Sequence, residues 1–349
     1  MTPWSVRTTA AADVRFVLFP SMGEYPVYDG HVYDAFDAAD DRHRAYRAAL
    51  RSAAPGRVVV DIGTGRDALW AIEAARSGAR HVYAIEADPA AAAGADDAVA
   101  AAGLDDRVTV LPGLSTDLTL PERADVCVSE IVGNIATAEG VIPILADARR
   151  RLCVPDCVWI PFRVQTWAAA VDLSAEGKPA VATESLPYLK RIFDAAGGPF
   201  DLRLCLGGPA GEAVISSAAA VESIVFDDEP PADDRAAAEV RIGVGGRMTG
   251  VLLWTRLAAE RTGGREVDTL NGDTRAWAPV HVPLDRPVPV TVGDRIPITL
   301  SRVTSDDGLH PDYTVTVGDQ PPWLSPHHGG PFRGTPFYDA LFTNLLRLS

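Results

Sequence analysis

The sequence predicts two consecutive domains, an α/β domain with a doubly wound parallel sheet and then an antiparallel β domain. An apolar, β-branched run over residues 58–62 stops at Gly63, which is typical of a buried parallel strand. Strand-like and helix-like segments then alternate, with short connections, up to about residue 160. From there to about residue 318, short segments alternate apolar and polar residues and are separated by Gly, Pro and Asp. That second pattern is typical of an antiparallel barrel or sandwich.

Each predicted element has its own local signal. Residues 1–55 show a loose apolar periodicity among Asp and Arg, which predicts a helical lead-in ending at Pro55-Gly56. The next predicted strands cover residues 58–62, 81–85, 108–111 and 124–129, and the predicted helices cover residues 68–77, 89–102 and 141–152. Later strand-like segments cover residues 213–226, 250–257, 280–284 and 313–317. We therefore place the lead-in at residues 1–55, the Rossmann-like α/β domain at 56–160 and the β-barrel domain at 161–349.

Composition narrows the class of protein. The 349 residues are 47% hydrophobic and 23% charged, which is typical of a globular protein. A net charge of −15 argues against nucleic-acid binding, which needs a basic face. No apolar run approaches the roughly 18 residues of a membrane-spanning helix, and residues 1–12 lack the features of a signal peptide. We therefore expect a cytoplasmic protein with neither a nucleic-acid nor a membrane partner.

Cysteines and histidines give no sign of a metal site. The cysteines form no CxxC pair and no histidine cluster lies near them, which predicts reduced, buried thiols; they are Cys127, Cys153, Cys157 and Cys205. Among the histidines, His281 and the pair His327-His328 stand out, and packing or solvation is the favoured explanation for each.

A nucleotide site is predicted where the first strand ends. The segment Asp61-Ile-Gly63-Thr-Gly65 lies between that strand and a helix, where glycines allow a tight turn and a close approach to a ligand. Glu86 ends the next strand and can accept hydrogen bonds from a ribose. The glycine spacing, continued to Ala68, also fits a relaxed dinucleotide fingerprint. An S-adenosylmethionine enzyme and an NAD-dependent oxidoreductase are both compatible with this pattern, and a purely structural turn is a third explanation.

Two glutamates flank a loop that follows the strand at 124–129. Glu130 and Glu139 lie on either side of Gly133, at the edge of the sheet where open α/β folds bind ligands. Two converging carboxylates repel each other unless a cation lies between them, and a guanidinium is a planar cation that matches carboxylates. The alternative is that both are surface residues, one of them capping the following helix.

These motifs together resemble the protein arginine methyltransferase family over residues 33–172. Ser129-Glu130-x-x-Gly133 with Glu139 resembles the double-glutamate loop of that family. Residues 59–65 resemble its cofactor motif, residues 78–86 its strand ending in the ribose-binding acid, and residues 151–161 its passage into a β-barrel. The chain departs from the family at Arg66-Asp67, where Thr-Gly is usual, and at Arg275-Ala276-Trp277, where the family has Thr-His-Trp.

The resemblance implies roles for particular residues. Glu130 and Glu139 would be catalytic and hold a guanidinium group. Binding of S-adenosylmethionine would fall to Arg42, Asp61, Gly63, Gly65, Glu86, Ser115, Thr116 and Glu130. The substrate would contact Tyr33, Phe36 and Trp277, although Trp277 is equally well explained as a core residue.

The function that follows is S-adenosylmethionine-dependent methylation of a guanidino nitrogen. Because the family histidine is missing, we favour free L-arginine or a guanidine-bearing natural-product intermediate as substrate. An arginine-containing peptide or protein is the second alternative, another amine or hydroxyl the third, and an NAD-dependent oxidoreductase the rival class. The family also implies a homodimer.

Overall fold

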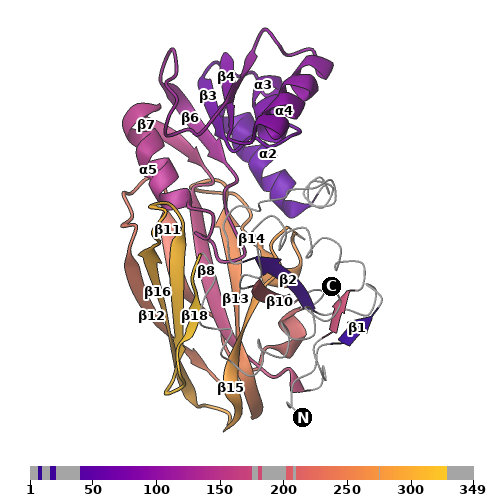
Figure 1. Ribbon diagram of the computed structural model, residues 1–349, viewed down its shortest axis with the longest axis vertical. Helices are drawn as coiled ribbons and strands as arrows, with labels where there is room; N and C mark the ends of the chain where they lie inside the picture. The colour runs from indigo at the N-terminus through magenta and orange to yellow at the C-terminus, as the bar shows by residue number, and fades with distance from the viewer. Residues whose placement is uncertain are drawn as a thin grey trace.

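The computed structural model describes residues 7–9, 16–20, 40–174, 180–182, 202–206, 210–274 and 276–327. Figure 1 shows the parallel sheet with its helices at one end of the molecule and the long strands of the second domain at the other. The predicted fold class is confirmed: a Rossmann-like domain precedes an antiparallel β-barrel domain.

The first domain is a five-stranded, fully parallel sheet in the order β5-β4-β3-β6-β7. Its strands are β3 (Val58–Ile62), β4 (His81–Glu86), β5 (Val108–Pro112), β6 (Ala124–Ser129) and β7 (Cys153–Ile160). The helices between them are α3 (Leu69–Arg76), α4 (Pro89–Ala101) and α5 (Val141–Arg151). The strand order reverses between β3 and β6, and that switch point is where open α/β sheets bind ligands.

The second domain is antiparallel and consists mainly of two sheets. One has the order β11-β8-β13-β15-β10-β2 and the other β12-β16-β17-β18. Its strands are β8 (Arg163–Val171), β10 (Leu202–Leu206), β11 (Ala219–Val225), β12 (Asp234–Arg241), β13 (Gly246–Ala258), β14 (Val267–Asp268), β15 (Val280–Val290), β16 (Arg295–Thr304), β17 (Pro311–Val317) and β18 (Trp323–Ser325). Period-two alternation predicted segments of β11, β13, β15 and β17 because these strands bury every second residue over part of their length.

The lead-in is not helical throughout. It contains two short strands, β1 (Arg7–Thr9) and β2 (Phe16–Pro20), before the helix α2 (Asp41–Ala53). β2 pairs with β10 at the edge of the barrel sheet, and β1 pairs with β9 (Ala180–Ala182). The run Phe-Val-Leu-Phe has strand propensity, but its pairing partner lies almost 200 residues further along the chain, so helical periodicity was the wrong signal there.

Each domain has its own hydrophobic core, and the loop after β6 links the two cores. The first core contains Tyr46 and Trp70 together with the strands of the parallel sheet. The second lies between the antiparallel sheets and also contains Ile135 and Ala138, which belong to the loop between Glu130 and Glu139. Burying this loop in the barrel core fixes its path across the domain junction.

Among the described residues, no helix is long and apolar enough to cross a membrane. The four cysteines are free and buried, as predicted.

Candidate active site

Both glutamates belong to one loop at the switch point of the parallel sheet. Glu130 directly follows β6, and Glu139 directly precedes Gly140, the N-cap of α5. A Cβ atom at Gly133 would lie 3.6 Å from Cγ of Glu139 and 3.0 Å from Cβ of Ala138, so the close turn of this loop needs a glycine there. The N-cap residue of α5 is Gly140 rather than Glu139, and this cap makes no side-chain hydrogen bond.

Glu130 is held by two donors from different helices. Its Oε1 accepts a hydrogen bond from Nη1 of Arg42 on α2, and its Oε2 accepts one from Nε1 of Trp70 on α3 at 2.6 Å. The Glu130 side chain is 12% exposed and that of Arg42 only 1%. This ion pair is thus largely withdrawn from water, where the attraction between the charges is stronger than at the surface.

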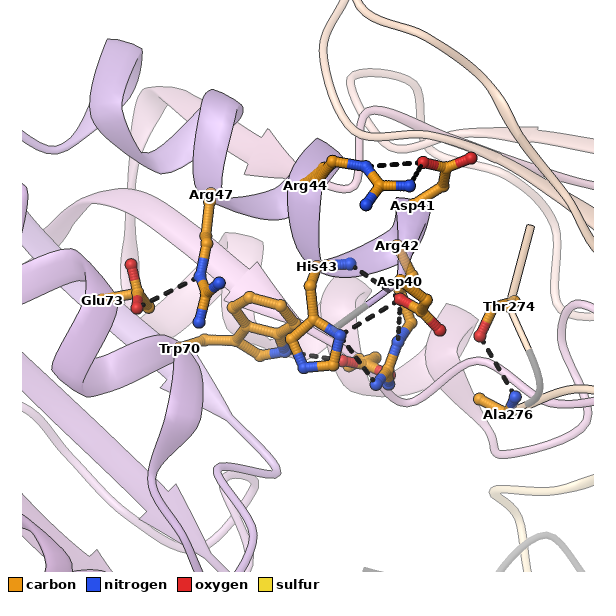
Figure 2. Close-up of polar contacts among 11 residues, drawn as sticks. Asp40, Asp41, Arg42, His43, Arg44, Arg47, Trp70, Glu73, Thr274 and Ala276 are labelled. Carbon is orange, nitrogen blue, oxygen red and sulfur yellow. Dashed lines mark hydrogen bonds and ion pairs between the residues drawn. The ribbon is translucent and has the colours of Figure 1, made fainter. Parts of the chain in front are cut away.

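The first turn of α2 brings further polar groups to the same place (Figure 2). Asp40 is the N-cap and accepts hydrogen bonds from the backbone N–H and from Nδ1 of His43, both at 3.1 Å. Burial opposes ionisation of Asp40, but hydrogen bonds from His43 and Thr274 outweigh it and hold the pKa of Asp40 well below its usual range. Asp40 is therefore a fixed negative charge 3.7 Å from Nε of Arg42.

The glycine loop lies against the glutamate loop. Gly63 and Gly65 both have positive φ angles, +75° and +69°, which favour glycine. A Cβ atom at Gly63 would come within 3.0 Å of Cγ2 of Ile131, the residue after Glu130. A ligand seated over the glycine loop would therefore lie close to the start of the glutamate loop.

Glu86 lies at the end of β4, beside the glycine loop. Its Oε2 accepts a hydrogen bond from the backbone N–H of Gly65 at 2.8 Å, and its Oε1 accepts one from Asp88 at 3.0 Å. Asp61, at the base of the loop, is fully buried and accepts a hydrogen bond from Oγ1 of Thr64 at 2.6 Å. Burial raises the pKa of Asp61 to about 7; hydrogen bonds from Thr64 and Ala71 oppose this rise, and the negative charges of Glu130 and Glu86 add to it.

The remaining predicted cofactor residues follow β5, next to Glu86. The backbone N–H of Gly113 donates to the carbonyl of Glu86 at 2.8 Å, which joins the two segments. Ser115 is buried and its carbonyl accepts a hydrogen bond from Arg151 at 2.7 Å, whereas Thr116 is exposed. The structure thus gathers the predicted cofactor residues along the carboxyl ends of neighbouring strands, except for Arg42, which lies on α2.

The barrel contributes one segment to the site. Trp277 is buried in the first core, and the guanidinium carbon of Arg42 lies 5.9 Å from the centre of its ring. The Nδ2 group of Asn134, in the glutamate loop, donates to the carbonyl of Ala278 at 2.6 Å. Tyr33 and Phe36 lie outside the described residues, as does Arg275.

Sequence reasoning missed Trp70, His43 and Tyr46. A tryptophan in an alanine-rich helix, just after a glycine loop, was the available signal for Trp70. Sequence reasoning also missed a buried polar network behind the glutamate loop, made by Thr137, Thr166, Glu222, Arg302 and Tyr313. No local pattern marks these residues, because they meet from five separate segments.

A second cluster lies on the far side of that loop. Oδ2 of Asp307 is 2.6 Å from Nδ1 of His310 and 3.2 Å from Nε2 of His327, and one ligand atom from each of the three lies within 4.8 Å of the others. The other oxygen of Asp307 accepts from Ser305 and from the backbone of Leu309 and His310. The two imidazoles stack in parallel at 4.1 Å. These contacts form a hydrogen-bonded turn, and the three ligand atoms are close enough together to hold a metal ion.

Fold and site together define a Rossmann-like methyltransferase domain joined to a β-barrel. Residues 47–157 match the family model of ribosomal protein L11 methyltransferase (PrmA). The arginine N(omega)-methyltransferase of Streptomyces achromogenes subsp. streptozoticus is 29% identical over 274 residues, which cover 74% of this chain and 73% of that protein.

Plant relatives match over a shorter stretch. The probable histone-arginine methyltransferase 1.4 of Arabidopsis thaliana is 38% identical over 123 residues, 34% of this chain but only 23% of that protein. The chain therefore matches less than a quarter of the length of that relative.

Solved structures share the fold. The PRMT1 enzyme–prozyme complex of Trypanosoma brucei with AdoHcy has a TM-score of 0.68 at 16% identity, covering 86% of this chain and 99% of that one. Protein arginine methyltransferase 10 of Arabidopsis thaliana has a TM-score of 0.65 at 20% identity, covering 86% and 97%. The chain thus carries a methyltransferase domain homologous to that of the arginine N-methyltransferases and shares their two-domain fold.

Proposed function

We propose that this protein is an S-adenosylmethionine-dependent N-methyltransferase that acts on a guanidino nitrogen, with free L-arginine or another small guanidine as its substrate. The observation that carries the proposal is the contact between the two loops. A Cβ atom at Gly63 would lie 3.0 Å from Cγ2 of Ile131, the residue after Glu130, so a cofactor on one loop would lie close to a cation held by the other.

The residues present fit the cofactor. Glu86 stands at the end of β4 with its carboxylate next to the glycine loop, where it can accept hydrogen bonds from a ribose. Arg42 is a buried cation that can bind the carboxylate of the cofactor, with Trp277 beside it. The homology to methyltransferases also favours S-adenosylmethionine over NAD.

When bound, S-adenosylmethionine supplies a methyl group already activated by its sulfonium charge. The remaining task for the protein is to align a nitrogen with that methyl. Glu130 and Glu139 would hold the guanidinium and draw its positive charge toward the nitrogens that do not react. Their charge also offsets the repulsion between the guanidinium and the sulfonium in a site with little water. The proton lost by the attacking nitrogen passes to a glutamate or to water.

The extent of the matches supports a small substrate. The Streptomyces relative, named for arginine itself, aligns over about three quarters of both chains, whereas the histone-arginine relative aligns over a small part of its length. The position of the family histidine is occupied by Ala276 in this chain. Methylation of arginine within proteins is the second candidate, because the shared fold is also that of protein arginine methyltransferases.

A mass-spectrometric assay separates these candidates. Purified protein and S-adenosylmethionine are incubated with free L-arginine in one reaction and with an arginine-rich peptide in another, and the Glu130→Gln variant serves as control. A gain of one methyl on free arginine that is lost in the variant supports the proposal, whereas methylation of the peptide alone favours the protein-modifying candidate. If neither gains mass while S-adenosylhomocysteine binds, the guanidino substrate is wrong. Light scattering of the same preparation tests the expected homodimer.

A further inference from the structure

We infer that Trp70 is a positioning residue for Glu130. Its indole N–H holds one oxygen of the Glu130 carboxylate in place while Arg42, the other partner of Glu130, also serves the cofactor. This inference rests on the proposed function, in which Glu130 binds the guanidinium and Arg42 binds the cofactor carboxylate.

The contact between the two residues is short and enclosed. Nε1 of Trp70 donates to Oε2 of Glu130 at 2.6 Å, and Trp70 is 3% exposed. An indole nitrogen can only donate, so this bond sets the direction in which one lone pair of the carboxylate points. A buried N–H without an acceptor is costly, which keeps Glu130 in the same orientation.

The indole is itself held in place. It lies in the first turn of α3, which begins directly after the left-handed residue Ala68 that closes the glycine loop. Its ring stacks on that of Tyr46 on α2, with centres 4.6 Å apart and 21° between the planes. The indole ring also lies beside the imidazole of His43, with ring centres 5.4 Å apart and planes tilted by 48°. Figure 2 shows Trp70 and His43 side by side, reaching the site from α3 and α2.

The same aromatic pair also fixes the backbone before Glu130. The hydroxyl of Tyr46 donates to the carbonyl of Ser129 at 3.1 Å. The last residue of β6 is therefore held by Tyr46 and the next side chain by Trp70. Residues of α2 and α3 thus hold both the backbone before Glu130 and its carboxylate.

Charge explains why a neutral donor is useful beside Arg42. Arg42 neutralises Glu130 when the two are paired, and it is drawn toward any second anion, including a carboxylate of the cofactor. Trp70 carries no charge, so it orients Glu130 and leaves the negative charge available to a guanidinium. A carboxylate has about four acceptor positions, and the bonds from Arg42 and Trp70 leave room for further donors.

The test is Trp70→Phe, which keeps a ring on Tyr46 and removes the N–H. Trp254→Phe is the matched control: Trp254 is fully buried in the barrel core, and its N–H has no hydrogen-bond partner in the described part of the chain. The loss of a hydrogen bond to a charged group changes a rate or equilibrium constant by about 10- to 100-fold. We expect kcat/KM for L-arginine to fall about 10- to 100-fold in Trp70→Phe, while the Kd for S-adenosylhomocysteine stays within about threefold. If kcat/KM matches that of Trp254→Phe, the inference is wrong.

A second measurement does not depend on activity. Urea unfolding of the wild type, Trp70→Phe, Glu130→Gln and the double variant forms a thermodynamic cycle. Trp70→Phe changes the equilibrium constant for unfolding by some factor, and we expect that factor to be at least about tenfold smaller in the Glu130→Gln background than in the wild type. If the effects of the two substitutions on the free energy of unfolding are additive, the inference is wrong. If the wild type methylates neither arginine nor peptide, the proposed function fails, and this cycle still decides whether Trp70 holds Glu130.

Discussion

Arg302→Met is expected to lower the free energy of unfolding by about 3–5 kcal/mol, because it leaves a buried carboxylate without its cation. Arg302 on β16 pairs with Glu222 on β11, and their side chains are 4% and 2% exposed. Arg302 also donates to the carbonyls of Ala232 and Pro231, both at 2.7 Å. The loss is a large share of the roughly 5–15 kcal/mol that stabilises a typical domain.

The network around Glu222 shows what remains after the substitution. Oε1 of Glu222 accepts from Thr137 at 2.8 Å and Oε2 from Thr166 at 2.7 Å. Thr137 also lies 2.7 Å from the hydroxyl of Tyr313. These hydroxyls offset only part of the buried charge. Adding Glu222→Met should therefore make the double variant more stable than Arg302→Met alone, because removing both charges removes the desolvation penalty.

Urea unfolding followed by circular dichroism measures these differences. Arg295→Met is the matched control, because Arg295 lies on the same strand and pairs with Glu239 at 2.9 Å in an exposed position. Surface pairs contribute about 0–1 kcal/mol, so this variant should stay close to the wild type. The buried-charge reasoning is refuted if Arg302→Met and Arg295→Met lose the same stability, or if the double variant is the least stable.

Three further predictions concern the cofactor side of the site. Burial raises the pKa of Asp61 to about 7. The folded state therefore binds a proton on the Asp61 carboxyl more tightly than the unfolded state does, and the stability that this proton confers is lost as pH rises from about 4 to 7. Asp61→Asn should remove this loss, on the order of 4 kcal/mol, so its stability relative to the wild type should increase between pH 4 and pH 8 in urea unfolding. Gly63→Ala should weaken S-adenosylhomocysteine binding at least about tenfold in calorimetry, because it adds left-handed strain and a close contact with the glutamate loop. Glu86→Gln should weaken the same binding about 10- to 100-fold by removing a charged acceptor.

Matched controls separate these effects from general destabilisation. Gly56→Ala has the same backbone strain as Gly63→Ala, with φ of +73°, but its Cβ would meet nothing within 4 Å. Its binding of S-adenosylhomocysteine should be unchanged, and equal losses in both variants would contradict the role given to Gly63. Glu122→Gln removes a carboxylate that is 40% exposed and paired with Arg80, and this variant should bind S-adenosylhomocysteine as tightly as the wild type. A pH-independent difference between Asp61→Asn and the wild type would contradict the raised pKa.

Local patterns accounted for four of the five strands of the parallel sheet and for the position of the glutamate loop, whereas β7 was not predicted. The strands and helices that were predicted in the first domain agree with the structure to within one residue at each end, because short connections separate them clearly in the sequence. The early strand β2 was missed because its partner, β10, is remote in the chain. The role of Trp277 also stays a prediction, although its burial agrees with the core explanation.

Sequence alone determined which residues stand at the carboxyl ends of the strands: Asp61, Glu86 and Glu130. A strand that ends at a glycine or an acid is a local feature, and parallel strands necessarily present their ends at one edge. Tertiary structure decided which partners those residues have. Arg42 and Glu130 are 88 positions apart, Trp70 and Glu130 are 60, and Glu222 and Arg302 are 80. Such pairs form only when helix packing and barrel closure bring distant segments together, and no periodicity within a segment encodes that approach.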